Sequence, residues 1–219
     1  MKKSRTIYLT TLLVLFSIIN GFSQTPVSKY GKLKLVGKQL SSECGNPVQI
    51  RGVSSHGIQW YNNCITSTSL EMLVNDWQID AFRIAMYVAE GGYITAPETF
   101  KPRINSMVNY CERNGVYAII DWHVLTPGDP NAYINEAKDF WDYMSKTHSG
   151  KKNVIYEICN EPNGVNWSSV KSYANTIIPI IRANDKDAII LVGTPEFSSN
   201  IDAAANDPLT GAKDRKSVV

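Results

Sequence analysis

The chain has 219 residues, with 22 Lys and Arg against 20 Asp and Glu, which gives a formal net charge of +2. This length favours a single domain with a sizeable core. The positive excess lies at the start of the chain, because without Lys2, Lys3 and Arg5 the balance becomes 19 to 20. Such a near-neutral balance argues against nucleic acid and anionic membrane surfaces as partners.

The first 23 residues have the layout of a secretory signal peptide. Basic residues precede an apolar run over residues 7–19, and the small residues Gly21 and Ser23 follow it. The apolar run is shorter than the ~20 residues that a membrane-spanning helix needs, so stable membrane insertion is not expected. We therefore predict a signal peptide over residues 1–23 and a secreted protein, extracellular or periplasmic, with an uncleaved anchor as the alternative.

The four cysteines are irregularly spaced and include no paired CxxC motif, which argues against a structural zinc site. Cys111 falls in a helical pattern and Cys159 in an apolar run, so both are predicted to be buried free thiols. A disulfide between Cys44 and Cys64 is the alternative that an oxidising compartment allows.

Apolar, β-branched runs begin at residues 48, 79, 116, 154 and 188, about 31 to 38 residues apart. This alternation with helical segments is typical of parallel βαβ units, and continuous apolar runs are typical of strands covered on both faces. The helical periodicity that follows the first four runs covers Ser69–Asp76, Glu98–Asn114, Asn131–Thr147 and Ser168–Asn184, the last interrupted by Pro179.

Two α/β architectures fit this alternation. A doubly wound sheet usually has a glycine-rich phosphate turn after its first strand, and the stretch SSHGIQWY contains none. A (β/α)8 barrel carries functional residues at the carboxyl ends of many strands. Polar residues do follow the first four runs at these ends: His56, Arg83, Tyr87, Asp121, His123, Asn160 and Glu161. We therefore predict an α/β fold of the (β/α)8 TIM-barrel type.

The predicted barrel is truncated after about its fifth strand. Five strands are recognisable, whereas such barrels have eight strands in ~250 residues. The last six residues, DRKSVV, match the translation of a common sequencing adapter. We therefore expect residues 24–213 to be a partial barrel domain and interpret residues 214–219 as read-through.

The stretch VIYEICNEPNG, residues 154–164, places two carboxylates four positions apart in an otherwise apolar run. Glu157 lies lower in the expected strand, and a buried carboxylate needs a partner. We predict that Glu157 pairs with Arg83. Glu161 lies at the carboxyl end, where a catalytic role is favoured because other polar residues converge on the same rim.

The NEP motif follows an apolar strand and is preceded, in order, by SSHGIQWY, FRIAMY and IIDWH. Together with GGYI, EAKDFW and the complete NVIYEICNEPNG stretch, this pattern resembles the bacterial endo-β-1,4-glucanase (cellulase) subfamily of glycoside hydrolase family 5 over residues 24–209. The resemblance implies a retaining hydrolase that cleaves internal β-1,4-glucosidic bonds of cellulose and related β-glucans. It also implies two glutamates about 5–5.5 Å apart, no metal, no cofactor, and a monomer at full length.

By this resemblance, Glu161 is the general acid/base that protonates the leaving oxygen. Arg83 would hold the catalytic nucleophile in its ionised form. The nucleophile itself belongs to a seventh strand that the chain does not reach. Phe197 stands where close relatives have tryptophan, so stacking on the leaving-group side is expected to be weaker. The residues implied to bind sugar are His56, Trp60, Tyr87, His123 and Asn160, with Asn160 on the 2-hydroxyl.

Several alternatives stay open. A metal-dependent barrel hydrolase would use His56, Asp121 and His123, although three histidines in the whole chain make a full ligand set hard to assemble. The chain could also be a non-catalytic sugar-binding fragment, or belong to an enzyme for β-mannan, xyloglucan or lichenan.

Trp122 is expected in the core, and His148 at a solvated helix end.

Overall fold

The structure, a computed structural model, describes residues 24–209 and 217–218. Its main sheet has six parallel strands whose spatial order is their order in the chain, β3-β4-β5-β6-β7-β8. This arrangement is that of the wall of a βα barrel. The strands are β3 (Gly52–Ser54), β4 (Ala81–Tyr87), β5 (Tyr117–His123), β6 (Val154–Glu157), β7 (Ile189–Leu191) and β8 (Ser217–Val218).

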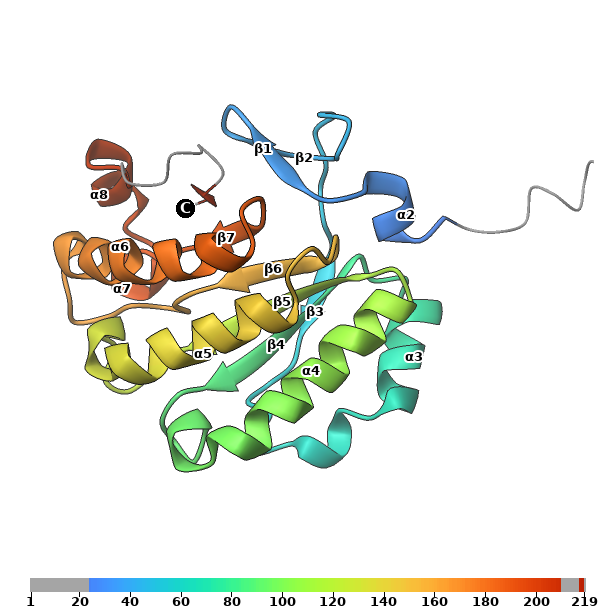
Figure 1. Ribbon diagram of the computed structural model, residues 1–219, viewed down its shortest axis with the longest axis horizontal. Helices are drawn as coiled ribbons and strands as arrows, with labels where there is room; N and C mark the ends of the chain where they lie inside the picture. The colour runs from blue at the N-terminus through green and yellow to red at the C-terminus, as the bar shows by residue number, and fades with distance from the viewer. Residues whose placement is uncertain (1–23, 210–216, 219) are drawn as a thin grey trace, which may run out of the picture.

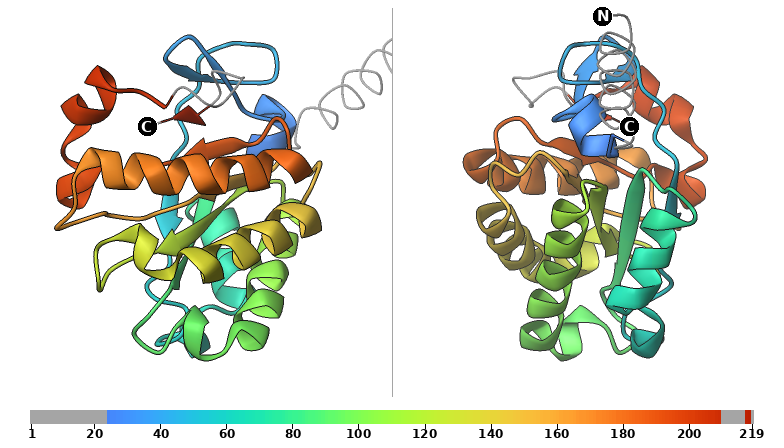
Figure 2. Two further views of the ribbon diagram at one scale, coloured as in Figure 1. Left: turned by 60° about the vertical axis from the view of Figure 1, so that its left-hand side comes forward. Right: turned by 90° about the vertical axis from the view of Figure 1, so that its right-hand side faces the viewer.

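Four long helices connect successive strands and pack on one side of the sheet, as Figures 1 and 2 show. They are α3 (Ser67–Asn75), α4 (Pro97–Arg113), α5 (Ile134–Thr147) and α6 (Trp167–Asn184). Shorter elements occupy the loops: η1 (Asn62–Cys64), η2 (Tyr93–Thr95), η3 (Pro130–Tyr133), α7 (Pro195–Ser198) and α8 (Ile201–Asn206). The predicted helices are confirmed, with shifts of up to three residues at their ends.

Side-chain caps set where two of these helices, α3 and α6, begin. Thr66 and Ser69 form a reciprocal capping box at the start of α3, and Asn166 accepts a hydrogen bond from the backbone N–H of Ser169 at the start of α6. The predicted interruption at Pro179 is wrong, because α6 continues through this residue. Its apolar face is fully buried against the sheet, and this packing outweighs the one hydrogen bond that a proline removes.

Alternation along the strands separates two cores. In β4, Phe82, Ile84 and Met86 point toward the helices, whereas Ala81 belongs to a second cluster on the inner face of the sheet. The helix-facing core is built mainly from apolar and aromatic side chains. The inner face is apolar only in its lower part, and its upper part carries charged and aromatic side chains.

The N-terminal segment closes the lower part of the inner face. It consists of α2 (Pro26–Tyr30) and an antiparallel hairpin of β1 (Lys34–Val36) and β2 (Gln39–Ser41), which lie together at one end of the strands in Figure 1. The Tyr117 hydroxyl donates a hydrogen bond to the carbonyl of Gly31 at 2.6 Å, and Lys32 pairs with Asp185 at 2.9 Å. The sequence patterns above did not predict this cap.

Two further expectations are corrected, and the alternative of a Cys44–Cys64 disulfide is not observed. The sheet contains a sixth strand, β8, beside the five that were predicted. Cys44 and Cys64 are both exposed and free, so the disulfide is not formed, while Cys111 and Cys159 are buried free thiols as predicted. His148 is 1% exposed rather than solvated, and its Nε2 lies 2.9 Å from Oδ1 of Asn105.

Two predicted segments lie largely outside the part of the chain that the structure describes. The signal peptide over residues 1–23 is entirely outside it. Of the suspected read-through, residues 214–219, only Ser217–Val218 is described, as strand β8. Among the helices of residues 24–209, none is long and apolar enough to cross a membrane.

Candidate active site

The strand register stacks inward-facing polar residues in layers near the carboxyl ends of β4, β5 and β6. Asp121 is the register partner of Ala85 on one side and of Glu157 on the other. One layer higher, Tyr87 pairs with His123. Because the strands are parallel, these side chains meet on the same face and at the same end of the sheet.

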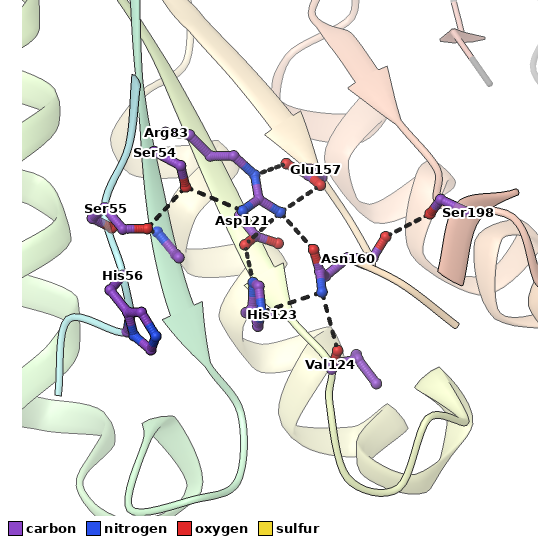
Figure 3. A network of polar contacts seen from close by, with 12 residues as sticks. Ser54, Ser55, His56, Arg83, Asp121, His123, Val124, Glu157, Asn160 and Ser198 are labelled. Carbon is purple, nitrogen blue, oxygen red and sulfur yellow. Dashed lines mark hydrogen bonds and ion pairs between the residues drawn. The ribbon is translucent and has the colours of Figure 1, made fainter. Parts of the chain in front are cut away.

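Arg83 organises the lower layer into an ion cluster (Figure 3). Its Nε lies 2.7 Å from Oε2 of Glu157, and its Nη2 lies 2.9 Å from Oδ2 of Asp121. Nη2 also donates to Oε1 of Glu157 at 2.8 Å and to Oδ1 of Asn160 at 2.7 Å. The predicted pair of Glu157 with Arg83 is therefore confirmed, and the cluster contains a second carboxylate that was not predicted to join it.

A hydrogen-bonded chain links this cluster to the rim. The ring Nδ1 of His123 lies 2.6 Å from Oδ2 of Asp121, and the amide Nδ2 of Asn160 lies 3.2 Å from Nε2 of His123 (Figure 3). The Asn160 amide oxygen faces Arg83, so its NH2 group faces the histidine. An amide NH2 only donates, so Nε2 of His123 accepts and Nδ1 carries the proton that is donated to Asp121.

Burial dominates the electrostatics of these groups. Burial, reinforced by the charge of Arg83, lowers the pKa of His123 to about 4. Complete burial raises the pKa of Asp121 to about 8, and the opposing attraction of Arg83 offsets only part of this effect. Burial also raises the pKa of Glu157, with the neighbouring Asp121 as the next cause. The cluster therefore holds two carboxyl groups against one guanidinium in a largely buried site.

Aromatic rings form a continuous row along the rim above this cluster. Tyr87 stacks on His123 with ring centroids 4.0 Å apart, and Trp60 lies 4.7 Å from Tyr87. His56 lies parallel to Tyr87 at 6.1 Å and contacts Trp60 at 5.4 Å. Trp60 is 46% exposed. Trp60 and His56 are exposed and Tyr87 is buried beside them, so the exposed rings lie above a polar floor, and flat apolar ring faces suit the C–H faces of sugar rings.

Glu161 differs from the buried carboxylates. Strand β6 ends at Glu157, so Glu161 lies in the following loop rather than at the end of the strand, which corrects the predicted strand boundary. Its side chain is exposed, and among the residues described no hydrogen-bond partner accompanies it. It is nevertheless close enough to Asp121 and His123 to affect both electrostatically. Glu161 is therefore a carboxylate on the rim that the fold leaves unengaged.

The metal-site alternative finds no support in this geometry. Nδ1 of His123 faces Asp121 and Nε2 faces Asn160, so neither nitrogen is free. Within the described part of the chain, no group of three or more His, Cys, Asp or Glu side chains is placed to hold a metal ion. As expected, Trp122 is fully buried in the helix-facing core.

Two residues at the site were missed from the sequence. Tyr61 is 51% exposed and its ring packs edge-on against His56 at 5.2 Å, so it extends the aromatic row. Its position directly after Trp60 was the available signal. Ser198 donates a hydrogen bond from its hydroxyl to the carbonyl of Asn160 at 2.9 Å. No sequence pattern indicates this contact, because it depends on an unusual backbone turn.

Comparison with known proteins agrees with this geometry. The family model described as cellulase (glycosyl hydrolase family 5) matches residues 41–219. Endoglucanase E-5 of Thermobifida fusca is 50% identical over 175 residues, which cover 80% of this chain and 38% of that protein. Endoglucanase CelA of Streptomyces lividans is 49% identical over the same shares of both chains.

Solved structures give the same result. The catalytic domain of Thermobifida fusca endoglucanase Cel5A (E5) superposes with a TM-score of 0.83 and 46% identity, covering 85% of this chain and 63% of that chain. A second structure of that domain, in complex with cellotetraose, matches equally well. The chain therefore spans less than two thirds of these relatives, and the predicted α/β fold, part of a (β/α)8 barrel, is confirmed. Because the family model covers most of its residues, the chain belongs to the cellulase family, glycosyl hydrolase family 5.

Proposed function

We propose that the protein to which this chain belongs hydrolyses internal β-1,4-glucosidic bonds of cellulose and related β-glucans, with Glu161 as general acid/base. The observation that carries the proposal is the contrast between Glu161, which is exposed and unengaged on the rim, and the two carboxyl groups that Arg83 holds in the layer below it. A structural relative in complex with cellotetraose supports the substrate class.

In this mechanism Glu161 acts twice. It first donates a proton to the leaving glycosidic oxygen, and it then removes a proton from the water that attacks the glycosyl-enzyme. Its exposure leaves both carboxylate oxygens available to substrate and water. A retaining enzyme also needs a nucleophilic carboxylate about 5–5.5 Å away. Asp121 is fully buried and Glu157 is 14% exposed, and both lie in the layer below the rim, so we assign the nucleophile to a residue beyond those described.

Arg83 suits the role of holding that nucleophile. Its Nε and Nη2 are used by Asp121, Glu157 and Asn160, whereas among the described residues Nη1 meets only the Ser54 hydroxyl, at 3.3 Å. We propose that Nη1 is the donor that keeps the nucleophile ionised, because a neighbouring guanidinium favours the charged form of a carboxyl group.

The sugar-binding surface proposed here is the aromatic row with its polar floor. Trp60 and Tyr87 would stack on glucose rings, and His56 and His123 would bind hydroxyl groups at the edge of the row. Asn160, fixed between Arg83 and His123, would meet the 2-hydroxyl of the sugar at the cleavage point. We further propose that the protein is exported and that it is a monomer at full length.

The test uses Glu161→Gln in the longer protein. Release of reducing ends from carboxymethyl cellulose should fall ~10²–10⁴-fold, because proton donation to the leaving group is lost. Binding of cellotetraose should persist, since the aromatic row is intact. Glu98→Gln, at a carboxylate that is 87% exposed at the start of α4, is the matched control and should keep wild-type activity.

Wild-type turnover by Glu161→Gln would contradict the assignment of Glu161 as general acid/base.

Parallel assays on β-mannan, xyloglucan and lichenan decide the substrate. Faster hydrolysis of any of these than of β-1,4-glucan would overturn the proposed specificity while leaving the role of Glu161 intact.

A further inference from the structure

The segment after β7 contains three consecutive residues with left-handed backbone. The φ angles of Glu196, Phe197 and Ser198 are 58°, 57° and 62°, and none of the three is glycine. Such conformations are uncommon outside glycine, and they persist only where the surrounding structure over-determines them. Three in succession therefore point to contacts that hold this turn in place.

Those contacts bracket Glu161. The Ser198 hydroxyl donates to the carbonyl of Asn160 at 2.9 Å, as Figure 3 shows. The backbone N–H of Phe197 donates to the carbonyl of Pro162 at 3.2 Å. The carbonyl groups immediately before and after Glu161 are thus held by two neighbouring residues of one turn.

A close approach of the chain at Gly193 brings the turn to this position. The N–H of Gly193 donates to the carbonyl of Cys159 at 3.2 Å. A Cβ atom at Gly193 would lie 2.3 Å from the carbonyl oxygen of Asn160, which is far inside van der Waals contact. Only glycine therefore allows the segment after β7 to lie against the segment that carries Glu161.

We propose that Ser198 is a positioning residue for Glu161, acting through the backbone carbonyl of Asn160. The Glu161 carboxylate has no hydrogen-bond partner within residues 24–209, so its location follows from its own backbone. The same contact also fixes the backbone of Asn160, whose side chain bridges Arg83 and His123. The inference rests on the proposed acid/base role of Glu161. It adds the hydrogen bond that orients this residue, from the Ser198 hydroxyl to the Asn160 carbonyl.

The test measures the reactivity of Glu161 in the 219-residue chain. The probe is N-bromoacetyl-β-cellobiosylamine, whose bromoacetyl carbon alkylates a carboxylate oxygen with loss of bromide. The maximal labelling rate and the half-saturating concentration are measured separately, and mass spectrometry identifies the site against a Glu161→Gln control. In Ser198→Ala the maximal rate should fall about ten- to a hundredfold because the carboxylate is misplaced, at an unchanged half-saturating concentration.

Two further variants isolate the hydroxyl group. Ser28→Ala is the matched control: it also removes one serine-to-carbonyl bond, to Thr25 at 2.8 Å, in the N-terminal cap, and should label at the wild-type rate. Ser198→Gly removes the hydroxyl but tolerates the left-handed backbone, and it should label as slowly as Ser198→Ala. Wild-type labelling rates in Ser198→Ala or Ser198→Gly would overturn the proposal.

A separate readout distinguishes failure of the inference from failure of the proposed function. If the wild-type chain is not labelled at Glu161 at all, the proposed acid/base site is contradicted. Amide hydrogen exchange over residues 158–163 then decides the positioning role. Exchange there should be faster in Ser198→Ala than in Ser28→Ala, while exchange in β4 and β5 stays unchanged. Equal exchange over residues 158–163 would overturn the inference.

Discussion

The ion cluster around Arg83 and the rim around Glu161 are formed by neighbouring residues of the same strands and loops, yet their environments are opposite. In the cluster, Asp121 is fully buried and Glu157 is 14% exposed, and both carboxylates contact one guanidinium. On the rim, Glu161 and Trp60 face solvent. Glu157 and Glu161 are only four residues apart, so the difference comes from depth in the barrel and not from residue type.

The two glutamates therefore have different roles: Glu157 stabilises the fold, whereas Glu161 is available for chemistry. A buried charge is tolerated only when it is paired, and removing one partner leaves the other uncompensated. An exposed carboxylate costs little to keep and stays available to a ligand. We therefore expect substitutions in the ion cluster to lower the free energy of unfolding strongly, and substitutions on the rim to change it little.

The largest expected effect follows from removing the centre of the cluster. Arg83→Met should lower the free energy of unfolding by about 3–5 kcal/mol, because two buried carboxyl groups lose their common partner. Urea denaturation of the 219-residue chain measures this change. Arg51→Met is the control: Arg51 is 82% exposed and lies 3.9 Å from Asp80, so a change within ~0.5 kcal/mol is expected. If Arg83→Met and Arg51→Met lost similar free energies of unfolding, the ion cluster would be no more important for stability than a surface ion pair.

A smaller effect should come from a buried histidine outside both regions. Burial, followed by the charge of Lys151, lowers the pKa of His148 to about 4. An unfolded histidine binds its proton near pH 6.5. The unfolded state therefore holds more protons between about pH 6.5 and 4, and stability falls as the pH falls through this window.

His148→Gln should abolish this contribution. Between pH 7 and pH 4.5 the wild-type chain should lose about 2–3 kcal/mol more of its free energy of unfolding than the variant. Urea denaturation at both pH values gives the comparison. Equal losses would mean that the acid sensitivity of the fold arises elsewhere, with the ion cluster the first region to consider.

Much of the fold could be predicted because its signals are local. The apolar runs of β4, β5 and β6 are long and regularly spaced, and helical periodicity fills the intervals. The pair of Glu157 with Arg83 was predictable because a carboxylate deep in an apolar strand needs a cation. The hairpin of β1 and β2 was missed because residues 34–41, KLVGKQLS, contain no apolar run of the kind that marks β3 and β7.

The remaining features depend on contacts between distant parts of the chain. The buried ring of His148 contacts Asn105, 43 residues away, and its polar flanking residues gave no sign of this contact. Pro179 stays within α6 because of the packing of that helix on the sheet. Ser198 reaches Asn160 only through a left-handed turn that no residue pattern specifies. These features are set by tertiary packing, which overrides local preference.

Side-by-side urea denaturation of Glu157→Gln and Glu161→Gln tests the division between cluster and rim most directly. Both substitutions replace a carboxylate by an amide of the same shape. Glu157→Gln should lower the free energy of unfolding by about 1–3 kcal/mol, because Arg83 loses a charged hydrogen-bond partner in a buried site. Glu161→Gln should stay within ~0.5 kcal/mol of the wild type. A stable Glu157→Gln beside a destabilised Glu161→Gln would contradict the assignment of the two carboxylates.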